Sequence, residues 1–400
     1  MDLQKVKALL DRRPPGLNPL ATRDQDAERA ASSHPDPRPP FLRDGDKIVH
    51  SWSFTRYTGK TQVVFTRNFD MMSSRIIHVQ LVSKTARYIA RVLGFNQDLI
   101  EAIALGHDIG HPPYGHVGEM ALSEISQDHG LGHYWHNYQA VRWLRDIEAH
   151  NLTLQTLDGI LCHNGESRAF AAPVRPGKTF VDLASEMEAI QATGSKKVLN
   201  DLAPTTPEGC IVRLCDVIGY VGRDVEDAIV MGMIRREDVP PRVAEVLGST
   251  NRQIVTALVN DLILCFVEDY PDVVGEAGAN LSTTPGDLNF HFSPEVRDAA
   301  NELLTFNYER IYQHPTVLEH NREVPSKMRQ VFERYLEDLK GGVRDSPVFV
   351  DHVNFTRSYL ASRGRESRYG TDEPPELVVR DFVAGMTEQY FERLHSGLGA

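Results

Sequence analysis

The chain is poor in cysteine and lacks any long apolar run. Its four cysteines show no CxxC spacing and are too sparse for a disulfide framework, which favours reduced thiols. The first ten residues are polar, so we expect no signal peptide. No apolar stretch approaches the roughly 20 residues of a membrane span. We therefore predict a cytoplasmic protein with no membrane partner.

The chain also has fewer basic than acidic residues, and its formal net charge is −12. An acidic surface argues against broad, charge-driven wrapping of nucleic acid, although a local basic pocket for phosphates stays open. Hydrophobic residues make up 41% and charged residues 24% of the 400 positions, which is typical of an ordinary globular protein with a substantial core.

Three regions can be distinguished along the chain. Residues 1–40 are rich in Pro, Arg, Asp and Ser and predict a poorly ordered N-terminal arm. Residues 41–240 hold the candidate catalytic core. Residues 241–400 predict a further, C-terminal helical region.

Helical periodicity dominates from residue 48 onward, and no strand alternation is strong enough for a large sheet. We therefore predict an all-α fold, with at most one short β-hairpin near residues 57–65. Gly94 and Asn96 separate the first two strong helices. Segments 164–182 and 271–292 are loop-like. Helices are predicted at 76–93, 99–107, 118–127, 137–148, 207–231, 243–267, 294–313, 323–339 and 376–394.

Two histidines interrupt the apolar faces of these helices. His78 shares its face with Val82 and Ala86, and His107 shares its face with Ile103. A buried imidazole must find a partner, because an unpaired polar group costs a few kcal/mol there. A metal ion is one such partner, and a satisfied core histidine is the commoner alternative when either residue is taken alone.

Asp216 opens a polar stripe on the helix predicted at 207–231. Tyr220, Asp224 and Asp227 follow at about one helical turn each, which suits a wet cavity. With His78 and the pair at 107–108, this aspartate would give two imidazoles and two carboxylates. Such a mixed site favours Mn, Fe, Co, Ni or Zn, with Mg also open, and one divalent ion there could activate water and polarise phosphorus.

Histidine density strengthens the functional interpretation. His107, Asp108, His111 and His116 fall within ten positions on a turn rich in Gly and Pro, and His136 follows shortly after. An isolated His-Asp pair would be weak evidence, but this concentration favours a site over a chance cluster.

The segment around these histidines resembles the motif of a known family. Residues 105–119 read LGHDIGHPPYGHVGE, which is similar to the signature of dGTPase-like HD-domain deoxynucleoside triphosphate triphosphohydrolases. The bare HD pair is shared by many phosphohydrolases, whereas the longer string is much more specific. Further blocks resemble this family in order at 56–63, 75–78, 135–137, 151–161, 215–228, 311–315 and 381–387.

The resemblance implies cleavage between the nucleoside 5′ oxygen and the α-phosphorus, with intact triphosphate leaving in one step. It also implies a divalent metal cofactor. The residues at the positions of the family's metal ligands are His78, His107, Asp108 and Asp216. His136 matches the family's proton-transfer residue. His111 and His116 match catalytic contacts around the α-phosphate.

The resemblance also implies substrate contacts. Arg75 and Tyr220 would contact triphosphate or sugar, Gln62 and Asp224 would read the 3′-hydroxyl, and Tyr312 would exclude the ribose 2′-hydroxyl. For Gln62 an ordinary loop amide, and for Tyr312 a plain core aromatic, are equal alternatives.

Three positions depart from the family pattern. Arg223 stands where the family usually has His, and family members often carry Phe where Tyr114 stands and Ala where Gly219 stands. These departures leave the matched metal ligands intact, but they bear on base preference and on activation by a second nucleotide.

Two other functions compete with this one. The first is an HD phosphohydrolase of nucleoside monophosphates or alarmones. The second is a nucleic-acid-binding regulatory protein with a vestigial site, and single-stranded DNA could be a minor partner. The complete candidate ligand set favours an enzyme, and deoxynucleoside triphosphates are the expected partners. By resemblance we also expect a homo-oligomer, with residues 241–400 completing the nucleotide pocket and making oligomer contacts, and leave open an allosteric nucleotide.

Overall fold

The computed structural model is almost entirely helical, and the all-α prediction is confirmed. It describes residues 16–32, 35–61, 74–164, 170–274, 281–365, 367 and 369–398. Across these ranges, none of the helices is both long enough and apolar enough to cross a membrane.

The elements fall into three groups along the chain. The first group is α2 (Pro40–Val49), α3 (Trp52–Thr55), α4 (Arg75–Leu93), α5 (Gln97–Gly106), α6 (Gly115–Asp128), α7 (His136–Arg142), α8 (Leu154–Cys162), α9 (Phe180–Ala192), α10 (Lys196–Asp201) and α11 (Pro207–Val230). The second is α12 (Pro241–Val246), α13 (Asn251–Asp269), α14 (Pro271–Val274) and α15 (Pro294–Asn307). The third is α16 (Pro315–Asn321), α17 (Val324–Gly341), α18 (Phe355–Ser362), α19 (Pro375–Ala384) and α20 (Glu388–Gly397).

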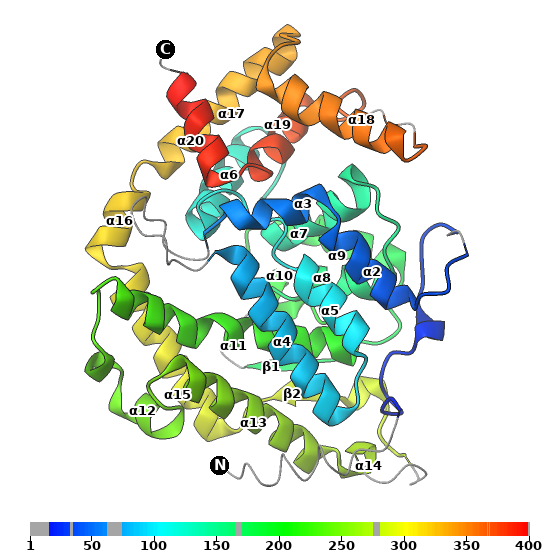
Figure 1. Cartoon of the computed structure of the whole chain (residues 1–400), viewed down its shortest axis with the longest axis vertical. Helices are drawn as coiled ribbons and strands as arrows, with labels where there is room; N and C mark the ends of the chain where they lie inside the picture. Colours follow the sequence, from blue (N-terminus) through cyan, green and yellow to red (C-terminus); the bar gives the residue numbers. More distant parts are fainter. Residues whose placement is uncertain are drawn as a thin grey trace.

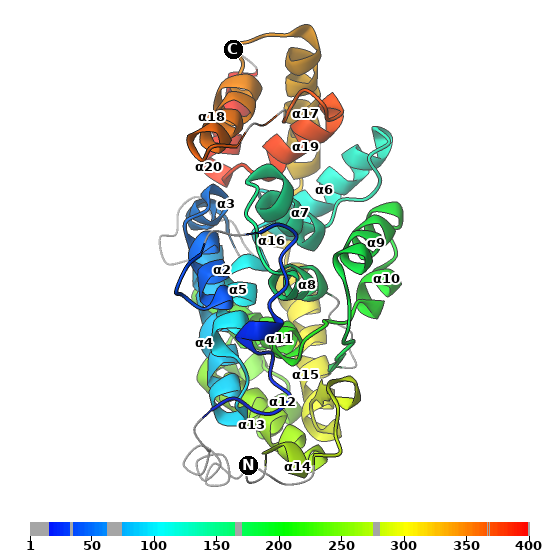
Figure 2. The ribbon, with the colours of Figure 1, turned by 90° about the vertical axis from the view of Figure 1, so that its right-hand side faces the viewer.

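Helix α11 is the central element of the fold. It packs against α4, α5, α8 and α13, and its residues are buried on nearly every face. Figure 2 shows α4 and α5 on one side of α11 and α8, with α9 and α10 on the other side. Helices α17 to α20 gather at one end of an elongated molecule, where α17 packs on α6 and α19 (Figure 1). The candidate metal ligands lie on α4, directly after α5 and on α11, three segments that pack against one another.

The cap signals before α5 behave as predicted. Gly94 adopts the left-handed conformation, with φ of 89°, and ends α4. The Asn96 side chain accepts hydrogen bonds from the backbone of Asp98 and Leu99 and starts α5. These local interactions set the angle at which α5 returns along α4.

The strands do not lie where a hairpin was expected. Residues Arg56–Gly59 form a short 3-10 helix, and residues 62–65 lie outside the described residues. A two-stranded antiparallel sheet forms instead from β1 (Ala171–Pro173) and β2 (Asn289–His291), both within segments predicted to be loops. The strands are only three residues long, so alternation is too brief to read from sequence.

The helix predicted at 376–394 is in fact two helices, α19 and α20. Gly385 ends α19, and a Cβ atom at this position would lie 2.3 Å from an Arg56 guanidinium nitrogen and 2.8 Å from the Trp143 ring. Thr387 then caps α20 by accepting from the Tyr390 backbone N–H. The close approach of these side chains, which the local pattern does not encode, requires a glycine at the break.

Part of the predicted N-terminal arm contacts the core. The backbone N–H and hydroxyl of Thr22 both donate to the buried Glu208 carboxylate, at 3.0 and 2.7 Å. Asn96 donates to the Thr22 carbonyl oxygen. The described segment 16–32 thereby lies against the start of α11, and the three-region division of the chain stays a prediction.

Candidate active site

The turn between α5 and α6 is shaped by close backbone contacts. A Cβ atom on Gly110 would lie 1.9 Å from the His136 carbonyl oxygen, and one on Gly118 would lie 1.9 Å from the Pro113 carbonyl oxygen. Tyr114 takes a left-handed conformation, with φ of 66°, which is strained for a bulky residue. Only small residues permit this turn to lie directly on the first turn of α7, beside His136.

Four predicted metal ligands converge from α4, the end of α5 and α11. The Nε2 atom of His78 lies 2.8 Å from Asp216 Oδ1 and 3.8 Å from Asp108 Oδ2. The Nε2 atom of His107 lies 3.5 Å from Asp216 Oδ1 and 3.6 Å from Asp108 Oδ1. Two ligand atoms on one small cation are roughly 3 Å apart, given bonds of about 2.0–2.2 Å. The spacing therefore suits a common divalent ion.

The environment of His107 supports such an ion. Its Nδ1 atom lies 2.7 Å from the Ala104 carbonyl oxygen, a contact that places a hydrogen on Nδ1 and turns Nε2 toward the carboxylates. Among the described residues, buried His107 Nε2 has no hydrogen-bond partner. Burial lowers the pKa of His107, but Asp108 and Asp216 outweigh it and raise this pKa to about 9. The same excess of negative charge would favour a divalent cation.

Arg75 and His111 hold Asp108 from two other sides. An Arg75 guanidinium nitrogen donates to Asp108 Oδ2 at 2.5 Å, and His111 Nε2 lies 3.3 Å from Oδ1. Burial raises the pKa of Asp108, but Arg75 and His107 hold it well below the ordinary value. Burial and nearby Arg75 lower the pKa of His111 well below its ordinary value, so this imidazole is neutral.

Glu119 joins the predicted catalytic histidines and was missed in the sequence. Its Oε1 atom lies 2.8 Å from His136 Nδ1 and accepts from the His136 backbone N–H at 2.7 Å. Its Oε2 atom lies 3.3 Å from Nδ1 of His116, whose side chain is 77% exposed. His111 stacks on His136 with ring centroids 3.8 Å apart. The His116–Glu119 spacing of three on one helix was the available signal.

His163 was also missed. It follows α8, is buried, and its ring centroid lies 4.7 Å from that of His107. Its Nε2 atom lies 3.2 Å from His136 Nε2, and its Nδ1 atom lies 2.7 Å from the Ile160 carbonyl oxygen. Burial and the neighbouring His107 and His136 lower the pKa of His163 to about 3. The preceding helix is buried almost throughout, so no polar stripe marked this residue.

The predicted substrate residues extend from the cluster along α11. Tyr220 and Asp224 lie one and two turns beyond Asp216, or about 6 and 12 Å along the axis. The Tyr312 hydroxyl donates to Asp224. Arg223 forms an ion pair with Asp227 at 3.0 Å. Gln62 lies outside the described residues.

The α5–α6 turn is also held by hydrogen bonds from the segment before α4 and from α20. The buried Lys60 ammonium donates to the carbonyl oxygens of His111 and Ala384, at 2.5 and 3.0 Å. Burial holds the pKa of Lys60 well below its ordinary value. Glu388 on α20 accepts from the backbone N–H groups of Thr61 and Tyr114. Lys60 and Glu388 thus hold the turn that contains His111.

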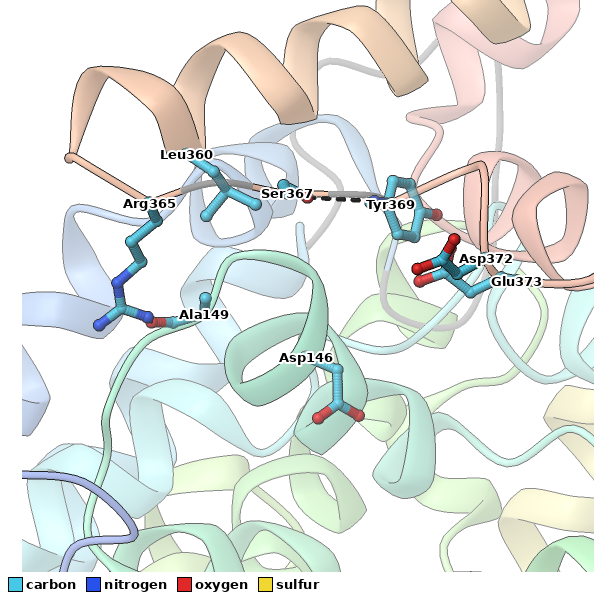
Figure 3. Close-up of a pocket in the computed structure, with 8 residues that line it drawn as sticks. All are labelled: Asp146, Ala149, Leu360, Arg365, Ser367, Tyr369, Asp372 and Glu373. Atoms are coloured by element: carbon cyan, nitrogen blue, oxygen red, sulfur yellow. Dashed lines mark hydrogen bonds between the residues drawn. The ribbon is translucent and has the colours of Figure 1, made fainter.

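A surface pocket of about 530 Å³ lies away from this cluster (Figure 3). Figure 3 shows Asp372 and Glu373 side by side and Arg365 reaching toward Ala149, whose carbonyl oxygen accepts from its guanidinium. Its carboxylates would repel a polyphosphate, and it contains none of the predicted site residues. The residues lining it are Asp146, Ala149, Leu360, Arg365, Ser367, Tyr369, Asp372 and Glu373.

Protein-family models match two separate parts of the chain. The HD domain model matches residues 75–220, which include all four predicted metal ligands, and a phosphohydrolase-associated domain matches residues 290–397. A deoxyguanosinetriphosphate triphosphohydrolase-like protein of Desulfatibacillum aliphaticivorans is 32% identical, over 88% of this chain and 85% of its own length. The chain belongs to this triphosphohydrolase-like family.

Two further members of the triphosphohydrolase-like family are similarly related. The protein of that name from Clostridium perfringens (strain SM101) is 31% identical over 92% of this chain and 89% of its own length. The one from Parvibaculum lavamentivorans is 30% identical over 96% of this chain and 97% of its own length. The predicted family is thus confirmed, and the chain is an HD-domain phosphohydrolase.

Proposed function

We propose that the chain hydrolyses deoxynucleoside triphosphates to deoxynucleoside and inorganic triphosphate. The observation that carries this proposal is the convergence of His78, His107, Asp108 and Asp216 beside the His136–Glu119 pair. A candidate metal centre and a candidate proton donor lie together in the segment matched by the HD domain. The names of the relatives supply the substrate class.

Two imidazoles and two carboxylates would hold one divalent ion. When bound, such an ion polarises a phosphoryl oxygen and lowers the pKa of a bound water. Arg75, which donates to Asp108, would neutralise phosphate charge beside the metal ligands. The lowered pKa of His111 suits it to a hydrogen-bonding role near the α-phosphate rather than to the role of an acid.

His136 would donate the proton that the leaving 5′ oxygen needs. Burial raises the pKa of Glu119, but His136 and His116 outweigh it, and the pKa lies well below its ordinary value. The ionised carboxylate holds Nδ1 of His136 and leaves Nε2 for the site. His116, exposed at the opening of the cluster, would contact the phosphates.

The sugar would lie along α11. Asp224 and Tyr312, joined by a hydrogen bond, would contact the 3′-hydroxyl and crowd C2′. A ribonucleotide would then lose affinity through steric contact at its 2′-hydroxyl. Tyr220 lies between them and the metal ligands, in reach of the triphosphate or sugar.

Product analysis in labelled water tests the reaction. The metal-loaded chain is incubated with each dNTP and each rNTP, singly and in pairs, in H₂¹⁸O. The proposal expects intact triphosphate that carries ¹⁸O, unlabelled deoxynucleoside, and little product from rNTPs. Stepwise release of orthophosphate, or release from monophosphates alone, would support the other HD phosphohydrolase reaction and reject this one. Paired substrates reveal activation by a second nucleotide.

A matched pair of variants assigns the activity to the cluster. Asp216→Asn should abolish hydrolysis and bound metal, whereas Asp269→Asn, at an exposed His291 contact, should leave both unchanged. Retained hydrolysis in Asp216→Asn would place the reaction elsewhere.

A further inference from the structure

His163 lies inside the histidine cluster, yet the proposed mechanism gives it no task. It is 1% exposed, and its Nε2 atom faces His136 Nε2 at 3.2 Å. Ring nitrogens of His163 and His136 also lie within 4.8 Å of an Asp108 carboxylate oxygen. A polar side chain at this depth needs a partner, and the partner here is the proposed proton donor.

Counting hydrogens on the two rings shows how they interact. A carbonyl oxygen can only accept, so the contact with Ile160 places a hydrogen on His163 Nδ1. The Glu119 carboxylate likewise requires a hydrogen on His136 Nδ1. A neutral imidazole carries a single hydrogen, so two Nε2 lone pairs would then face each other. At 3.2 Å that arrangement is repulsive unless a hydrogen lies between them.

The charge on the outer partners decides which ring carries the shared hydrogen. His136 is backed by the Glu119 carboxylate, a charged acceptor that makes this ring the better hydrogen-bond donor of the two. His163 is backed only by the neutral Ile160 carbonyl group. The hydrogen therefore belongs to His136, and His163 is the acceptor.

We propose that His163 is a positioning residue that accepts the Nε2–H of His136. With Glu119 on the opposite nitrogen, it fixes the plane of the His136 ring and holds the Nε2 hydrogen until a substrate oxygen takes its place as acceptor. This inference rests on the proposed function. Neither contact requires His163 to touch substrate.

The proton transfer then runs as follows. The 5′ oxygen replaces His163 as the acceptor, the N–H bond of His136 breaks, and an O–H bond of the deoxynucleoside forms. The electron pair of the breaking P–O5′ bond stays on that oxygen. The attacking water gives its oxygen to the triphosphate, and one of its protons restores the hydrogen on His136.

Three variants test the role of His163. His163→Ala removes the acceptor, and His163→Gln keeps an acceptor oxygen on a side chain of similar reach. His352→Gln is the matched control, because His352 is equally buried and bonds the Tyr369 hydroxyl at 2.7 Å. For each variant we would measure kcat and KM on a dNTP, bound metal, the thermal midpoint and histidine ¹⁵N NMR spectra, with His136→Gln assigning the His136 signals.

We expect His163→Ala to lower kcat by about 10- to 100-fold with KM within about threefold of wild type, at unchanged metal content. His163→Gln should recover several-fold of this loss, and His352→Gln should leave kcat unchanged. In the spectra, the His136 Nε2 signal should carry a bound hydrogen in wild type and shift in His163→Ala.

An unchanged kcat and an unchanged His136 signal in His163→Ala would overturn the proposal. Loss of metal in step with activity would also overturn it, because His163 would then be a ligand. If the wild-type chain released no triphosphate from any dNTP, the proposed function would fail, while the NMR comparison would still decide whether His163 accepts from His136.

Discussion

Two buried aspartates, Asp381 and Asp108, lie in regions of opposite character. Asp381 on α19 has both oxygens saturated, by Gln139 Nε2 at 2.9 Å, by the Arg142 guanidinium at 2.7 to 3.1 Å and by the Tyr369 hydroxyl at 3.0 Å. The ion pair with Arg142 joins the C-terminal helices to α7 with well-aligned donors.

Asp108 lies in a cluster that is not saturated. Arg75 bonds one oxygen, but buried nitrogens of its neighbours His107 and His111 have no hydrogen-bond partner among the described residues. Leaving such groups unpaired costs about 1–3 kcal/mol each. The carboxylate of Asp381 is fully bonded and stabilises the fold, although Gln139 Oε1 beside it also has no partner among the described residues. An open polar group is therefore no sign of a site by itself, and it is the grouping of open nitrogens around the candidate metal ligands that suits an ion or a substrate.

The largest expected effect is on activity at the unsaturated cluster. His107→Ala should lower kcat/KM for a dNTP by at least about a thousandfold, since a ligand to the proposed ion is lost. Its thermal midpoint, measured without metal, should fall as well, because the buried ring and its Nδ1 contact with Ala104 are lost, so activity is compared per folded chain. His129→Ala, at the half-buried contact with Glu333, should retain activity. A fully active His107→Ala would contradict the assignment of His107 and its cluster to the active site.

Substitution of Asp381, whose carboxylate is fully bonded, should lower the stability of the fold and leave the metal site intact. Asp381→Asn leaves the buried Arg142 charge uncompensated and should lower the free energy of unfolding by about 3 kcal/mol. Metal content per folded chain should not change. Asp36→Asn breaks the exposed pair with Arg38 and should have no measurable effect in the same urea titration. Equal stability of all three proteins would show that saturation does not stabilise the fold.

The same aspartate predicts a pH dependence of stability. Burial raises the pKa of Asp381, but Arg142 outweighs it, so its folded-state pKa lies below the unfolded value of about 4. A depressed pKa stabilises the fold above the unfolded value, and this contribution is lost as pH falls through the folded value. The stability difference between wild type and Asp381→Asn should therefore shrink below about pH 4. Urea titrations from about pH 7 to about pH 3 would measure it, and a constant difference would contradict this assignment.

The smallest expected effect concerns Gly219, where the family often carries alanine. A Cβ atom there would lie 2.9 Å from Val82 Cγ2 and 3.4 Å from His78 Cε1. Since the valine can shift slightly, Gly219→Ala should cost about 1 kcal/mol of stability or less. It should change kcat/KM by no more than several-fold. A loss as large as that of His107→Ala would mean that the His78 position tolerates no displacement.

The amphipathic helices could be predicted from sequence. In α4 and α11 a regular apolar face and a polar stripe coexist, and cap residues such as Gly94 mark the ends. His78, His107 and Asp216 interrupt those patterns, so the sequence alone is enough to single them out. That their ligand atoms meet within 4 Å is a property of how α4, α5 and α11 cross.

Helix α8 could not be predicted in the same way. Nearly every one of its residues is buried, including Thr156 and Asp158, so exposure gives no 3.6-residue period. His163, at its end, therefore carried no signal. Glu119 was visible three residues after His116, but only the docking of α7 on the α5–α6 turn brings it to His136.

The sequence by itself determined the helical class, the family and the residue types of a mixed imidazole and carboxylate site, because these depend on local periodicity and on contiguous motifs. Tertiary structure alone decided which nitrogens face each other, as in the 3.2 Å contact between His136 and His163. Hydrogen bonds act over about 3 Å, and only packing brings groups distant in sequence that close.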